Sequence, residues 1–141
     1  MACVSGRAFT GGAMLALGCD RRCINSKRGY RCTNELDSGL PFADPTAALF
    51  GMRCSPAAVA PLLVGAKRMP VVRCCDLGLV DAAIEPEGLG AAARALAASR
   101  APEGTRKDLM REANELLFRD ALAVLRQGGD PFLSLAARSR L

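Results

Sequence analysis

The chain has 141 residues, of which 50% are hydrophobic, and a net charge of +5. This length suits one domain and is short for two. The chain has neither Trp nor His, and its single Tyr adds little aromatic area to a core. A chain without His lacks the commonest general base and metal ligand, so composition predicts a protein that is not an enzyme.

The first 32 residues carry the whole net charge. They hold six basic residues and one acid, whereas residues 33–141 hold thirteen of each. Four of the seven cysteines and five glycines also lie there. A basic, acid-poor, glycine-interrupted start is typical of an organellar transit peptide. We expect an irregular basic arm over 1–32, a small helical body over 33–141, and a plastid or mitochondrial location.

Two short helices are predicted after a turn-rich stretch at 33–43. The pairs Asp44-Pro45 and Ser55-Pro56 each place an N-cap residue before a proline at the first helical position. Pro61 would kink or end the second helix.

The next run, 69–77, is β-like because its valines and paired cysteines suit an extended backbone. Alanine then predicts a helix over 88–100.

The strongest pattern lies at 105–127. Apolar residues recur there at helical spacing, and the stripe is broad enough for burial on more than one side. We predict a partner-helix interface at Leu109, Leu116, Leu117 and Val124. A last short helix is expected from Asp130. The predicted fold class is therefore mainly α, with short helices, long irregular segments and one strong amphipathic helix near the C-terminus.

Three cysteines of the arm form a candidate metal site. Cys19, Cys23 and Cys32 would supply three thiolates, and a structural zinc site needs four ligands. The fourth would come from Cys3, Cys54, Cys74 or Cys75. A disulfide within the arm and free thiols are the alternatives. Zinc is the one cofactor that the sequence offers, and otherwise none is expected.

The same arm holds a dense run of basic side chains. These are Arg21, Arg22, Lys27, Arg28 and Arg31. They could neutralise RNA phosphates while Tyr30 stacks on a base. Docking on an acidic protein surface is the alternative.

Other motifs are weak. The acids form no catalytic constellation and resemble solvated helix faces with local ion pairs. The glycine-containing segment GRAFTGG lacks the lysine and the strand-to-helix order of a phosphate-binding loop. The C-terminal Ser-Arg-Leu resembles a peroxisomal address. We assign no catalytic residue from the sequence.

These features favour a non-catalytic accessory subunit of a large organellar assembly, such as a photosynthetic or respiratory complex. A small RNA-binding protein of an organellar ribosome is one alternative, and a zinc- or thiol-dependent redox factor is another. The longest uncharged apolar stretch, 54–66, is shorter than the roughly 20 residues of a membrane span. Peripheral attachment to a membrane complex stays open.

Overall fold

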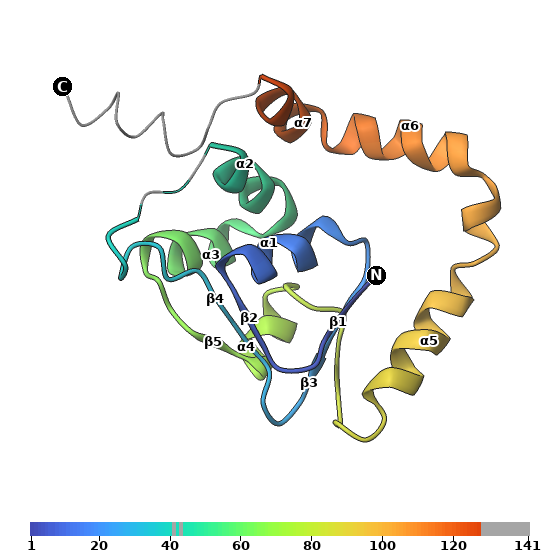
Figure 1. Ribbon diagram of the computed structural model, residues 1–141, viewed down its shortest axis with the longest axis horizontal. Helices are drawn as coiled ribbons and strands as arrows, with labels where there is room; N and C mark the ends of the chain where they lie inside the picture. Colours follow the sequence, from blue (N-terminus) through green and yellow to red (C-terminus); the bar gives the residue numbers. More distant parts are fainter. Residues whose placement is uncertain (41, 43, 128–141) are drawn as a thin grey trace.

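The N-terminal segment is built from regular elements (Figure 1). The structure, a computed structural model, describes residues 1–40, 42 and 44–127. The first 32 residues form β1 (Ala2–Val4), β2 (Arg7–Phe9), α1 (Thr10–Gly18), β3 (Arg22–Asn25) and β4 (Tyr30–Cys32). The expectation of an irregular arm is therefore wrong. Its strands are short, and their pairing partners lie far along the chain, which single-sequence patterns do not reveal.

The helices predicted from proline and alanine signals are confirmed. They are α2 (Asp44–Arg53), α3 (Pro56–Val59) and α5 (Leu89–Ser99). Pro61 does not end the second helix, because the chain continues through the π-helical turn η1 (Ala60–Val64).

The predicted β-like run at 69–77 is mostly helical. Only β5 (Met69–Pro70) is extended there, and α4 (Val71–Asp76) follows it directly. Pro70 stands before the first turn of α4 with extended backbone angles, φ −66° and ψ 161°. Helix packing against β4, β5 and β6 (Ala82–Ile84) outweighs the β preference of the valines.

Two small sheets organise the described residues. One has the order β1-β3-β6 with parallel pairs throughout. The other has the order β2-β4-β5, in which β2 and β4 are parallel and β5 is antiparallel to β4. Strands from the first 32 residues thus pair with later strands. The mainly α expectation holds only in part, since the fold is α/β with helices around small sheets.

The core lies between these sheets and the helices α1 to α4. Its largest fully buried apolar side chains are Phe50, Leu17, Ile24, Leu62 and Leu79. Arg31 is buried among them with 2% exposure. Its guanidinium donates hydrogen bonds to the carbonyls of Leu79 and Ala13. A buried charge is tolerated when its donors are paired in this way.

The C-terminal elements differ from the predicted single helix over 105–127. After η2 (Glu103–Thr105), the structure has α6 (Lys107–Leu117) and α7 (Arg119–Arg126), separated at Phe118. Figure 1 shows α6 on the outside of the molecule, whereas α7 packs on α2. The helix expected from Asp130 lies outside the described residues. None of the described helices has the length and apolar character that crossing a membrane requires.

Candidate functional site

Two strands of the second sheet end at the same edge. β2 and β4 are parallel and in register, with Phe9 opposite Cys32. The carboxyl ends of parallel strands in α/β folds form the usual place for a ligand site. The residues that follow these two strands, Thr10 after β2 and Asn34 after β4, are joined by a hydrogen bond. The Thr10 hydroxyl donates to Asn34 Oδ1 over 3.0 Å.

Helix α1 begins at this edge. Its N-cap residue, Phe9, makes no side-chain capping hydrogen bond, so the first-turn N–H groups have no such cap. Gly11 and Gly12 are exposed, and a Cβ atom placed on either would meet nothing within 4 Å. Thr10 has a φ of +40°, which is strained for a β-branched residue. This helix start presents backbone donors and positive dipole potential to open space.

Glu35 lies directly after Asn34 on the other side of this edge. It is 5% exposed, and no hydrogen-bond partner for either carboxylate oxygen exists among the described residues. Its backbone carbonyl is held by the amides of Ser38 and Leu40. A buried carboxylate without donors is costly and is a feature of acid–base sites rather than of structural cores.

These two features make one kind of chemistry available. A carboxylate can take a proton from carbon, and N–H donors at a helix start can stabilise the oxyanion that results. Asn34, which directly precedes Glu35, links this segment to the helix start. Its side chain accepts a hydrogen bond from Thr10 and donates one to Ser38. We identify this edge, with Thr10, Gly11, Gly12 and Glu35, as the candidate active site.

The cysteines predicted as metal ligands lie in different surroundings. Cys23 pairs across strands with Cys3, and Cys32 pairs with Phe9. The described ranges contain no group of three or more metal-ligating side chains. Burial raises the pKa of Cys32 and Cys54 and raises that of Cys74 to about 11, so these three are protonated thiols near neutral pH.

The predicted basic surface is divided between interior and exterior. Arg31 and Arg22 are buried, and burial lowers the pKa of both. Arg21 Nη1 lies 2.9 Å from Asp81 Oδ1, and Lys27 Nζ lies 2.8 Å from Glu85 Oε2. Only part of the run is therefore available to a polyanion.

The predicted partner-helix residues also separate. Leu109, Leu116 and Leu117 on α6 are 58–61% exposed, while Val124 on α7 is half-buried.

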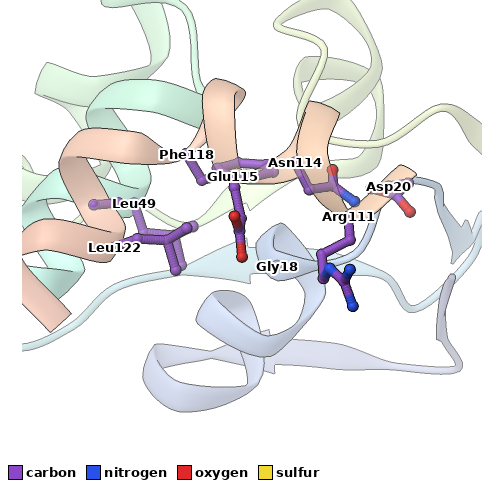
Figure 2. Close-up of a pocket in the computed structure, with 9 residues that line it drawn as sticks. Gly18, Asp20, Leu49, Arg111, Asn114, Glu115, Phe118 and Leu122 are labelled. Atoms are coloured by element: carbon purple, nitrogen blue, oxygen red, sulfur yellow. The ribbon is translucent and has the colours of Figure 1, made fainter. Parts of the chain in front are cut away.

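A hollow of about 510 Å³ lies between the end of α1, α2 and the two C-terminal helices (Figure 2). Its apolar lining is Leu49, Phe118, Ala121 and Leu122, and its polar lining includes Arg111 and Glu115.

Sequence reasoning missed Glu35 and the helix start. The segment GRAFTGG carries no recognisable strand pattern in the sequence, yet β2 covers its Arg7–Phe9 portion. The acids were assigned to solvated faces, and Glu35 stands in a turn-rich stretch that offers no periodic signal. The parallel pairing of two three-residue strands is what brings them together.

Comparison with known proteins identifies the fold. No protein-family model matches the chain, and no curated protein matches it. Solved structures do match. A probable enoyl-CoA hydratase, EchA3, from Mycobacterium tuberculosis has a TM-score of 0.81 at 21% identity over 96% of this chain. An apo enoyl-CoA isomerase from the same organism has a TM-score of 0.76 at 22% identity over 94%. An enoyl-CoA hydratase/isomerase family protein from Pseudomonas syringae has a TM-score of 0.77 at 22% identity over 86%.

These similarities show that the chain has the enoyl-CoA hydratase fold. The chain spans 56%, 56% and 54% of the lengths of these three structures. The expectations of a non-catalytic accessory subunit and of a protein that is not an enzyme are wrong, because the solved proteins with this fold are enzymes. The same finding overturns the photosynthetic assignment.

Proposed function

We propose that this chain catalyses double-bond migration in an enoyl thioester, with Glu35 as the proton carrier and the start of α1 as the oxyanion site. The carrying observation is the buried carboxylate of Glu35 without a hydrogen-bond partner among the described residues, in a segment that Asn34 joins to the uncapped helix start. The printed names of the neighbours, enoyl-CoA hydratase and isomerase, support coenzyme A as the thiol of the substrate.

The reaction needs one base that returns its proton. The Glu35 carboxylate takes a proton from C2 of a 3-enoyl thioester, which lies between the carbonyl and the double bond. The electron pair moves into a dienolate whose oxyanion accepts hydrogen bonds from first-turn N–H groups of α1. The Glu35 carboxylic acid then delivers the proton to C4, and the conjugated 2-enoyl thioester forms. Atoms and charge balance without a co-reactant.

Isomerisation fits this edge better than hydration does. Hydration of a 2-enoyl thioester requires a group that activates water as well as a proton donor for C2, tasks that two carboxylates can share. Helix α1, with the sequence TGGAMLALG, contains no carboxylate that could serve as the second group. Among the buried polar residues of the described chain, Glu35 is the one carboxylate.

The test is a direct assay of the full chain. Purified protein is incubated with a 3-enoyl-CoA, and the conjugated product is followed by its ultraviolet absorbance and by chromatography. We expect turnover, and we expect Glu35→Gln to lower kcat/KM by about 10²–10⁴-fold, the range for loss of a general acid–base group. Glu87→Gln is the matched control, since that side chain is 78% exposed.

Two results would count against the proposal. One is a folded chain that produces no 2-enoyl-CoA, and the other is a Glu35→Gln variant with unchanged kcat/KM. A 3-hydroxyacyl product from a 2-enoyl-CoA, without isomerisation of the 3-enoyl compound, would reassign the chain to hydration.

A further inference from the structure

Two cysteines face each other on neighbouring strands of the first sheet, whereas Glu35 follows a strand of the second sheet. Cys3 of β1 is the register partner of Cys23 of β3, and the Cys23 thiol lies 3.8 Å from the carbonyl oxygen of Ala2, the residue before Cys3. Neighbouring strands lie about 4.8 Å apart. A disulfide accepts Cα separations of about 4.4–6.8 Å. In-register residues of parallel strands also project to the same face of the sheet.

Access to the pair is one-sided. Cys3 is exposed, whereas Cys23 is 1% exposed. β1 is an edge strand within the described residues, and Cys3 lines a surface hollow of about 400 Å³ together with Cys19. A small oxidant therefore reaches Cys3 first. Burial and the neighbouring Cys3 thiol raise the pKa of Cys23 to about 11, so Cys23 is a protonated thiol near neutral pH.

We propose that Cys3 and Cys23 form an oxidation site, at which a hydroperoxide converts the two thiols into a cross-strand disulfide. This is a modification of the chain, and it differs from a redox activity centred on Cys19, Cys23 and Cys32. It stands on the register and exposure of the pair and does not depend on the proposed isomerase reaction.

The chemistry balances with one peroxide per pair. Cys3 sulfur attacks the terminal peroxide oxygen, the O–O bond breaks, and the alcohol (or water) leaves with the thiol proton. Cys23 sulfur then attacks the resulting sulfenic acid at sulfur, the S–O bond breaks, and water leaves with the proton of Cys23. Two thiols are oxidised by two electrons, and the peroxide is reduced by two.

The other cysteines lack this geometry. Cys32, Cys54 and Cys74 are buried, and Cys75 is exposed on α4. Cys19 is the competitor, since it is half-buried in the same hollow as Cys3. A useful experiment must therefore separate a Cys3–Cys23 bond from a Cys3–Cys19 bond.

The probe is hydrogen peroxide, added in equimolar amount to the reduced full chain. We expect the thiol count after denaturation to fall from seven to five, peptide mapping to find Cys3 joined to Cys23, and a reductant to restore all seven. Cys3→Ser should abolish the bond at little structural cost, because the side chain is exposed. Cys19→Ser and Cys75→Ser should leave it intact.

Three results would overturn the proposal. They are a Cys3–Cys19 bond, a disulfide between two chains, and a Cys3 that stops at sulfenic acid, detected with a dimedone probe. Cys3→Ser provides the deciding variant because Cys23→Ser alters a buried position and can impair folding. Since no step uses enoyl-CoA, failure here leaves the isomerase proposal untouched, and failure of the isomerase assay leaves this one untouched.

Discussion

The burial of helices α1 and α6 is the opposite of what their sequence patterns predict. α1 contains three glycines and a weak apolar pattern, yet it buries Ala13, Ala16 and Leu17. α6 has the regular apolar stripe of a packed helix, yet none of its residues is buried. Burial therefore follows position in the fold: α1 packs against β1, β2, β4 and α2, whereas α6 contacts its neighbours η2 and α7. The strongest apolar pattern in a sequence therefore need not mark a helix at the centre of the molecule.

The largest expected effect comes from the buried charge beneath α1. Replacing Arg31 by Met removes its hydrogen bonds to the Leu79 and Ala13 carbonyls. We expect a loss of about 3–5 kcal/mol in the free energy of unfolding, measured by urea denaturation, because two buried hydrogen bonds from a charged donor are lost. Arg111→Met on α6 is the control, because its side chain is 70% exposed beside Asp108 and should change stability by less than about 0.5 kcal/mol. Equal effects of the two variants would refute the assigned difference between the regions.

A second pair of variants compares apolar side chains. Phe50 of α2 is 1% exposed, and Leu117 of α6 is 61% exposed. Phe50→Ala should lower the free energy of unfolding by about 3–5 kcal/mol through lost burial and a cavity. Leu117→Ala should change it by less than about 0.5 kcal/mol. Both are read from denaturant midpoints. A large loss for Leu117→Ala would mean that α6 is covered in solution.

Replacing Glu35 is expected to raise the free energy of unfolding, unlike the two preceding substitutions. Its carboxylate is buried without a partner among the described residues, so its charge costs free energy that a structural residue would not. Glu35→Gln should raise the free energy of unfolding by about 1 kcal/mol while it lowers turnover, the usual opposition of stability and activity. The same denaturation assay measures it, with Glu87→Gln as the exposed control. A variant that is less stable than the parent chain would indicate that Glu35 has a structural role.

Much of the local structure was predictable from sequence, and little of the site was. The pairs Asp44-Pro45 and Ser55-Pro56 predicted the starts of α2 and α3 correctly, because proline in the first turn is a local signal, although Ser55 makes no side-chain capping hydrogen bond. The strands were missed because three-residue runs such as Arg7–Phe9 carry no usable period, and long-range pairing determines them. Glu35 was not predicted for the same reason. It follows β4, and its burial depends on the long-range pairing that positions this strand. The absence of His does not exclude acid–base chemistry, since a carboxylate with backbone donors can carry it.

An effect of similar size, and one that disappears in acid, is expected at the contact between Asp81 and the start of β3. Burial alone would raise the pKa of Asp81, but hydrogen bonds from the Arg21 side chain and the Arg22 amide, with both positive charges, hold it below its usual value. A carboxylate with a lowered folded pKa stabilises the fold above its unfolded pKa of about 3.9, and this contribution disappears as pH falls through the folded value. Asp81→Asn should therefore cost about 1 kcal/mol at pH 7 and nearly nothing in strong acid. Denaturation of both proteins from pH 7 to pH 2 should give curves that converge as pH falls. Curves that stay parallel would show that the Asp81 charge does not stabilise this end of the sheet.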